Sequence, residues 1–218
     1  MIVLGDNASE IERQAAEEIK NFLLEHNSSY IKIINSQKIE NFKKGYDLVI
    51  IGTPKTNPFL EEVYALTNAT RVTEEYLGEG KGVLEILRNP WDESKAMLLV
   101  EGSDEWGVKA GSMMLEETQK FKDKVRAFVN WEEYTGIDFP IDSAEEAIEY
   151  AKTDIDVKKF IEEWSSQGYD IKVHGEFLNE SNMGSHWKIT FSVLDPIECI
   201  FVLKFKSNGT IIWKGGAI

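Results

Sequence analysis

The feature that most constrains this fold is a short apolar run, Asp47-Leu-Val-Ile-Ile-Gly52, in which four aliphatic residues follow one another without a polar interruption. A continuous run closed by glycine is typical of a strand that is buried on both faces, and such strands belong to parallel sheets covered by helices. The run therefore predicts an α/β domain of three layers, with a mostly parallel sheet between helices.

Strands and helices alternate around this run. Ile2–Leu4 and Tyr30–Ile34 have the composition of short strands. Between them, Ser9 and Glu12 form a capping box, which marks the start of a helix, and apolar residues follow at helical spacing. A further helix is predicted over Phe59–Leu66. This alternation favours parallel strands joined by helical crossovers.

The next two strands predict an antiparallel hairpin within the same sheet. The segments 83–87 and 96–100 are apolar, and Asn89-Pro-Trp-Asp92 between them is typical of a turn. Ser103 is predicted to cap a helix that runs to about Thr118, and a last strand is predicted over 125–129.

A second, smaller domain follows a break in the pattern. Residues 131–142 have no periodicity and are interpreted as a linker, which gives domains at 1–138 and 139–218. A helical region is predicted from Ser143 to near Trp164, either continuous or restarting at Thr153. Alternating apolar segments then predict four antiparallel strands, the last two joined at Asn208-Gly209. We expect an α+β domain in which a helical layer covers a four-stranded meander.

Composition excludes several classes of function. The net charge of −14 argues against nucleic-acid binding and against docking on anionic lipid. No apolar stretch approaches the ~20 residues that cross a bilayer, so no membrane insertion is expected. The single cysteine, Cys199, is expected to be a buried, inert thiol. High charge with one cysteine also fits a thermophile. As written the chain reads as cytoplasmic, and a cell-surface location would require a leader removed before Met1.

Four segments of the first domain carry a resemblance to a known family. They are residues 46–57, Gly80-Lys-Gly82, Asn89-Pro-Trp91 and 98–107, which contains Leu98-Leu-Val-Glu-Gly-Ser-Asp-Glu-Trp-Gly107. In order and spacing, roughly residues 1–120 resemble archaeal S-layer (surface-layer) proteins. A looser likeness is to the non-catalytic N-terminal α/β domain of some glycoside hydrolases. Both resemblances imply a scaffold or interaction module.

The second domain is similar in outline to PepSY-like or cystatin-like domains. Trp187 opens one of its strands, and residues 208–212 read Asn-Gly-Thr-Ile-Ile. The resemblance implies a domain that binds or inhibits.

Polar residues at the carboxyl ends of the predicted strands are the candidate ligand-binding residues. In open α/β sheets ligands bind outside these ends, near a switch in strand order. The candidates, which could hold an anion or a sugar hydroxyl, are Asp6, Asn7, Thr53, Ser103 and Asp104. The same residue types are ordinary helix caps, each contributing about 1 kcal/mol, and we favour that structural interpretation.

No catalytic group, metal site or cofactor motif is predicted. His26, His174 and His186 are widely spaced, although the last two could meet across strands. Residues 78–82 lack the spacing of a phosphate loop. Of the tryptophans, Trp91 and Trp131 are candidate surface platforms, whereas Trp106, Trp164, Trp187 and Trp213 are expected in the core.

Five asparagines precede x-Ser/Thr, more than the composition would lead us to expect. They are Asn7, Asn27, Asn68, Asn179 and Asn208. They indicate either glycosylation of an exported chain or the frequent use of asparagine in turns.

Taken together, these observations favour a non-enzymatic structural or interaction protein, whose partner is another protein or a second copy of itself. One alternative is a small-molecule or carbohydrate-binding protein that uses the crevice at the strand ends. Another is an inhibitor or regulatory module that adds a strand of its C-terminal sheet to a partner.

Overall fold

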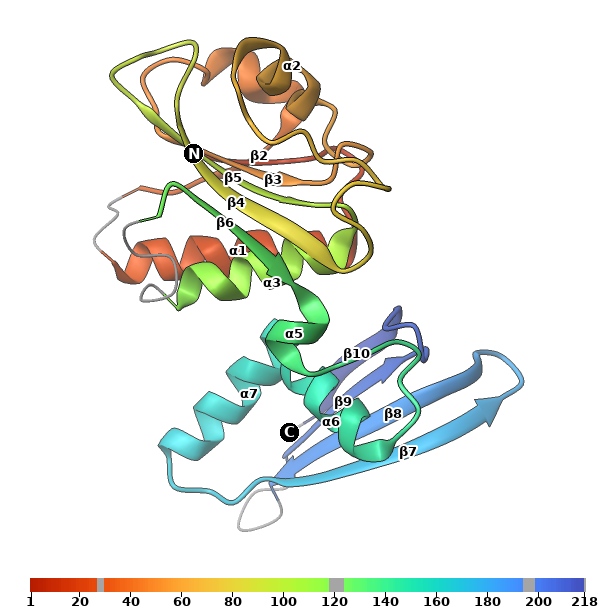
Figure 1. Ribbon diagram of the computed structural model, residues 1–218. Coiled ribbons are helices and arrows are strands. Elements are labelled where there is room, and N and C mark those ends of the chain that lie inside the picture. The colour runs from red at the N-terminus through yellow and green to blue at the C-terminus, as the bar shows by residue number, and fades with distance from the viewer. Residues whose placement is uncertain (27–29, 118–123, 194–198, 218) are drawn as a thin grey trace. The chain divides into compact units, whose positions relative to one another are not determined.

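The computed structural model describes residues 1–26, 30–117, 124–193 and 199–217, and it divides into two compact units, Met1–Gly136 and Ile137–Ile218 (Figure 1). Each unit has a sheet of its own. The unit boundary lies two residues before the one placed from the sequence.

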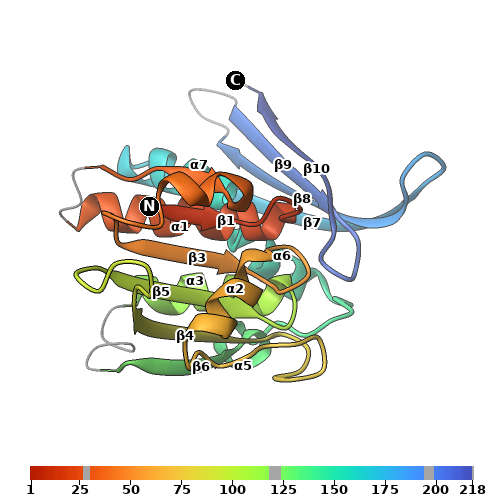
Figure 2. The same cartoon turned by 90° about the horizontal axis from the view of Figure 1, so that it is seen from above.

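The first unit is built on a six-stranded sheet in the order β2-β1-β3-β5-β4-β6 (Figure 2). The pairs β1–β2, β1–β3 and β3–β5 are parallel, whereas β4 runs antiparallel to both β5 and β6. The predicted mostly parallel sheet with an antiparallel hairpin is therefore confirmed. The strands are β1 (Ile2–Leu4), β2 (Ile33–Asn35), β3 (Leu48–Gly52), β4 (Lys81–Arg88), β5 (Ala96–Gly102) and β6 (Arg126–Asn130).

Helices cover both faces of this sheet. Figure 1 shows α1 (Glu10–Glu25) and α3 (Glu105–Glu116) on one face, and α2 (Phe59–Leu66) on the other. A short 3-10 helix, η1 (Ser36–Asn41), follows β2. All five residues of β3 are buried, as the uninterrupted apolar run predicted. The three-layer arrangement follows from that burial, because a strand with two apolar faces needs cover on each.

A buried ion pair joins α1 to α3. Glu18 on α1 accepts hydrogen bonds from Lys109 (Nζ–Oε1 2.6 Å) and from Ser112 (Oγ–Oε2 3.1 Å), and all three side chains are buried. Burying two charges is favourable only when they are paired and hydrogen-bonded, so this contact fixes how the two helices align.

The second unit is an α+β domain with an antiparallel meander in the order β10-β9-β8-β7. It has two helices, and the second begins after Asp154, which agrees with the predicted alternative that the helical region restarts at Thr153. Asp154 is the N-cap of the second helix: its side chain accepts hydrogen bonds from the backbone N–H groups of Asp156 (2.9 Å) and Val157 (3.2 Å). The elements are α6 (Ala144–Lys152), α7 (Ile155–Ser166), β7 (Lys172–Glu180), β8 (Gly184–Val193), β9 (Cys199–Phe205) and β10 (Ile211–Ala217).

The start of the predicted linker is wrong. Residues Trp131–Thr135 form a short helix, α5, which begins at the cap Asn130 and ends at Gly136 with φ +73°. Trp131 is buried and packs on Trp106, with ring centroids 5.0 Å apart, and Trp91 stacks on Phe59 at 5.2 Å. Trp131 is therefore a core residue, and Trp91 is partly buried with its ring stacked on that of Phe59.

Trp213 was also placed wrongly by the alternating pattern. The register of β10 against β9 shifts between Ile211 and Trp213. This irregularity turns Trp213 to the face of the sheet that Lys204 occupies, where it is 47% exposed. Cys199 is buried, as expected. No helix within the described residues is long and apolar enough to span a bilayer.

Candidate functional site

The carboxyl ends of β1 and β3 hold three of the candidate residues. Asp6 accepts a hydrogen bond from Ser36 (Oγ–Oδ2 2.6 Å), and Asn7, which is exposed, donates from its backbone to the Thr56 carbonyl (3.4 Å). Thr53 is buried; its backbone N–H donates to Glu12 Oε1 (3.1 Å), and its side-chain Oγ1 accepts from the Thr56 N–H (3.2 Å). The side chains of Asp6 and Thr53 are thus bound within the chain, whereas Asn7 is held through its backbone and has an exposed side chain.

The switch in strand order between β1 and β3 is filled by the loop that follows β3. A Cβ atom built on Gly5 would lie 2.1 Å from the Thr56 carbonyl oxygen. Asn57, fully buried, donates from Nδ2 to the Ile51 carbonyl (2.9 Å) and so holds the loop against the strand ends. The place where open α/β sheets bind ligands is thus occupied by backbone.

Glu12 is the centre of this contact, a role that sequence reasoning missed. Its Oε2 accepts from the Ser9 N–H (2.7 Å), which completes the predicted capping box, while its Oε1 accepts from Thr56 Oγ1 (2.5 Å) as well as from Thr53. Burial raises the pKa of the Glu12 carboxyl, and these hydrogen bonds oppose that rise. A capping residue that also ties down a distant loop has no local sequence signal.

The other two candidates lie at the carboxyl end of β5. Asp104, and not Ser103 as predicted, is the N-cap of α3, accepting from the Gly107 N–H (2.9 Å). Its second oxygen accepts from the Gly80 N–H (2.7 Å), and Ser103 Oγ donates to the Tyr76 carbonyl (3.0 Å). Both side chains therefore hold the loop that precedes β4. The two groups end on neighbouring strands, because β3 pairs directly with β5 and Gly52 lies opposite Glu101. Their side chains bind different segments: Thr53 contacts Thr56, whereas Ser103 and Asp104 hold the loop that precedes β4.

A pair of buried carboxylates, Glu85 on β4 and Glu101 on β5, was not predicted. Glu101 is fully buried, and its Oε2 accepts a hydrogen bond from the Tyr64 hydroxyl of α2. Burial, with the charge of Glu85 adding to it, raises the pKa of Glu101 to about 8. Glu85 accepts from Arg126 and from the Thr70 N–H (2.8 Å). The signal in the sequence is a single acidic residue within each of two apolar strands.

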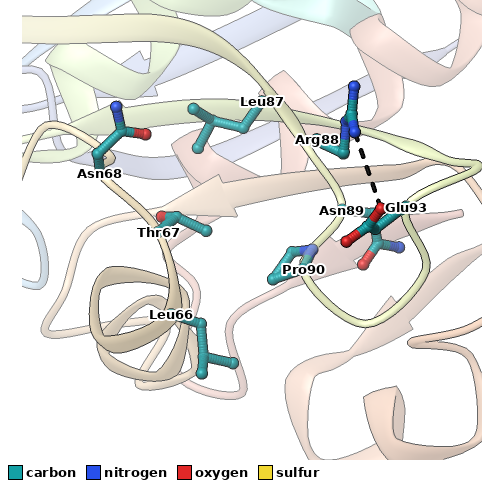
Figure 3. Close-up of a pocket in the computed structure, with 8 residues that line it drawn as sticks. All are labelled: Leu66, Thr67, Asn68, Leu87, Arg88, Asn89, Pro90 and Glu93. Carbon is teal, nitrogen blue, oxygen red and sulfur yellow. Dashed lines mark ion pairs between the residues drawn. The ribbon is translucent and has the colours of Figure 1, made fainter.

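An open hollow lies at the opposite end of β4 from the Gly80 loop. It encloses about 530 Å³ between the end of α2 and the β4–β5 turn (Figure 3). Leu66, Leu87 and Pro90 give it apolar surface, and Arg88 and Glu93 face one another across part of its rim, Nη1–Oε2 3.8 Å. Asn89 is buried and serves the fold, since its Nδ2 donates to the Lys43 carbonyl (2.9 Å).

The histidines are not gathered into a site. His174 and His186, expected to be able to meet across strands, are paired instead with Thr190 and Leu178. In the described ranges no group of three or more His, Cys, Asp or Glu side chains is placed to hold a metal ion.

The asparagines of the x-Ser/Thr sequences are accessible where the structure describes them. Asn7, Asn68, Asn179 and Asn208 are exposed, and Asn27 lies outside the described residues. Asn68 lines the hollow of Figure 3, and Asn208 accepts from the Thr210 N–H (3.1 Å) in the β9–β10 turn.

Comparison with models of known protein families finds no match to this chain, and comparison with curated proteins finds none either.

Proposed function

We propose that this chain is a non-enzymatic structural or interaction protein, an S-layer-like α/β domain followed by a small α+β domain. The proposal is supported by the hydrogen bonds that the polar residues at the strand ends make within the chain. Asp6, Thr53, Ser103 and Asp104 each bind another part of the chain, and the backbone at Thr56 fills the space beside Gly5. Groups committed in this way hold loops in place and are not presented to a ligand.

A combined screen of the intact protein tests the proposal. Thermal unfolding is measured with sugars, nucleotides and divalent cations, since a ligand at 100 times its Kd adds about 2.7 kcal/mol to stability. Hydrolase and transferase substrates are then assayed for turnover. The proposal expects no ligand shift that depends on the strand ends and no turnover. A shift or an activity that Asp104→Ala abolishes, in a variant that remains folded, would contradict it.

Carbohydrate or small-molecule binding in the hollow of Figure 3 is the second candidate. Its volume of about 530 Å³ falls within the range of small-molecule sites, and it combines apolar and polar side chains. This candidate expects a thermal shift that Arg88→Ala and Asn68→Ala remove and Asp104→Ala leaves unchanged. If no sugar produces a shift, or if Asp104→Ala alone removes it, the hollow is not the binding site.

A further inference from the structure

The four-stranded sheet of the second unit has one face covered by helices and one that displays an exposed tryptophan. On the covered face Tyr150 of α6 packs on Phe205, with ring centroids 4.5 Å apart, and Phe160 of α7 packs on Phe201 at 5.9 Å. Side chains alternate between the two faces along a strand. Lys204, which lies next to Phe205 on β9, therefore belongs to the opposite face, which we call the outer face.

The indole of Trp213 lies over Gly215, two positions further along the outer face. A Cβ atom built on Gly215 would lie 3.0 Å from each of two carbons in the six-membered ring of this indole. One side of the ring is therefore against the strand, and Trp213 remains 47% exposed. A larger residue at position 215 would lift the ring from the sheet. The structure thus puts an aromatic platform at Trp213, whereas the sequence favoured Trp91 and Trp131.

A row of charged side chains continues this platform across the sheet. Lys204 on β9 is opposite Trp213, and Lys188 on β8 is opposite Lys204. Glu176 on β7 completes the row opposite Lys188. Residues that are directly opposite in neighbouring strands lie on one face and contact each other. The row crosses all four strands, a span of about 14 Å at the usual strand spacing.

The charges beside the platform are balanced in pairs. Lys188 Nζ lies 2.8 Å from Glu176 Oε1, and Lys204 Nζ lies 3.4 Å from Glu180 Oε2. Two lysines directly opposite each other repel, and the two glutamates offset that repulsion. Each ion pair also holds a donor and an acceptor in position next to the ring. Because each lysine is matched by a glutamate, the row complements a neutral polar ligand better than an anion or a cation.

A pyranose sugar has the complementary chemistry. When its substituents are equatorial, the axial C–H groups make an apolar face that packs on an aromatic ring, while the hydroxyls at its rim donate and accept hydrogen bonds. Its binding site therefore needs an aromatic surface and a few fixed polar groups. Trp213 provides the aromatic surface, and the two ion pairs provide the polar groups.

We propose that the outer face around Trp213 binds a neutral carbohydrate of equatorially substituted pyranose units, of which a β-1,4-linked glucan is the simplest. One sugar packs on the indole of Trp213, and the next lies along the row toward Lys204 and Lys188. The proposal goes beyond the interaction role proposed above. It concerns the second unit, whereas the hollow of Figure 3 belongs to the first.

Titration of the ¹⁵N-labelled full chain with cellotetraose tests the proposal through the indole N–H signals in NMR spectra. The chain has six tryptophans, and the signal that disappears in Trp213→Phe identifies Trp213. An exposed platform binds weakly, so we expect a Kd between roughly 0.1 and 10 mM. The Trp213 signal should shift to saturation while that of the buried Trp131 stays in place. If the Trp213 signal does not shift, the proposal is overturned.

Two variants separate a platform from a merely exposed side chain. Trp213→Ala should weaken cellotetraose binding about tenfold or more. Gly215→Ala keeps the tryptophan but displaces its ring, so it should weaken binding as well. The matched control is Phe177→Ala, which removes an exposed aromatic residue of the same sheet opposite Trp187, on the covered face, and should bind as the parent does. Equal Kd values for Trp213→Ala and Phe177→Ala would contradict the proposal.

A matched anionic sugar tests the charge argument. Tetraglucuronate has the same β-1,4 linkage and equatorial substituents as cellotetraose, with a carboxylate on each unit. It should bind about tenfold more weakly or less, because Glu176 and Glu180 already occupy the lysines. Tighter binding of tetraglucuronate than of cellotetraose would show that the site selects an anion and would overturn the assignment to a neutral sugar.

Arg88→Ala distinguishes this surface from the hollow of Figure 3. Binding at the outer face should survive Arg88→Ala and be lost in Trp213→Ala, and the opposite result would place the sugar in the hollow and overturn the proposal. Failure of sugar binding at Trp213 leaves the interaction role in place. Turnover that depends on Asp104 would contradict the non-enzymatic proposal and leave the Trp213 platform in place.

Discussion

The Tyr64 hydroxyl of α2 donates a hydrogen bond to the carboxyl of Glu101, which is fully buried at the end of β5. Burial raises the pKa of Glu101 to about 8, so the side chain is largely protonated at neutral pH. An acid buried among apolar strands is tolerated in its neutral form, because that form avoids most of the desolvation penalty.

Stability is therefore expected to fall as pH rises through this pKa. The folded-state pKa is raised, so the contribution of Glu101 is fully present below its unfolded-state value of about 4.5 and is lost as the pH approaches about 8. The slope reaches at most about 1.4 kcal/mol per pH unit. Urea unfolding of wild type and Glu101→Gln between pH 5 and 9 measures it. In Glu101→Gln the free energy of unfolding should depend less steeply on pH than in the wild type. Glu93→Gln, at an exposed site, should keep the wild-type pH dependence. Parallel curves for wild type and Glu101→Gln would contradict the prediction.

The buried pair Glu18–Lys109 should be costly to break from one side. Lys109→Met leaves the Glu18 carboxylate without its cation, and we expect a loss of about 3–5 kcal/mol in the free energy of unfolding. The double variant Glu18→Leu/Lys109→Met should lose less than the two single variants combined. Chemical unfolding of the three proteins measures the coupling. Additive losses would show that the two side chains act independently.

Gly5 should tolerate no side chain, because a Cβ atom there would overlap the Thr56 carbonyl. Gly5→Ala is expected to destabilise the first unit by about 3 kcal/mol or more through displacement of the loop. Gly45→Ala is the control, because a Cβ atom at Gly45 would meet open space and the only cost is its positive φ of 84°. We expect this variant to lose about 1 kcal/mol in the free energy of unfolding. Equal effects in thermal unfolding would mean that the loop does not close on the strand ends.

In the second unit, Tyr150 should contribute through its hydroxyl, which donates to the Gly209 carbonyl at 2.6 Å in a buried position. Tyr150→Phe is expected to lower stability by about 1–2 kcal/mol, since the Gly209 carbonyl loses a buried partner. Tyr30→Phe, at an exposed position, should have no measurable effect. Comparable losses in the two variants would contradict the role of this hydrogen bond.

The fold followed from the sequence wherever the signal was local. The apolar run over β3 predicted a doubly covered strand, and Ser9 with Glu12 predicted the start of α1. Asn208-Gly209 predicted the β9–β10 hairpin, where Gly209 has φ +80°. The short helix α5 was missed because five residues are too few to show a helical period.

The site was less predictable because its residues owe their roles to distant segments. Asp104 was proposed as a ligand group, yet its second oxygen holds the Gly80 loop, 24 residues away. The carboxyl of Glu101 is bound by Tyr64 of α2, 37 residues away in the sequence, and an irregular register in β10 turns Trp213 outward. No spacing within a single element encodes these contacts.

The free energy of unfolding of Thr53→Ala, Ser103→Ala and Asp104→Ala tests most directly the claim that the strand ends serve the fold. Residues kept for binding usually cost stability, so replacing them is neutral or stabilising. The account predicts losses of about 0.5–2 kcal/mol, largest for Asp104, whose carboxylate accepts from two backbone N–H groups. Unchanged or increased stability in all three variants would contradict it.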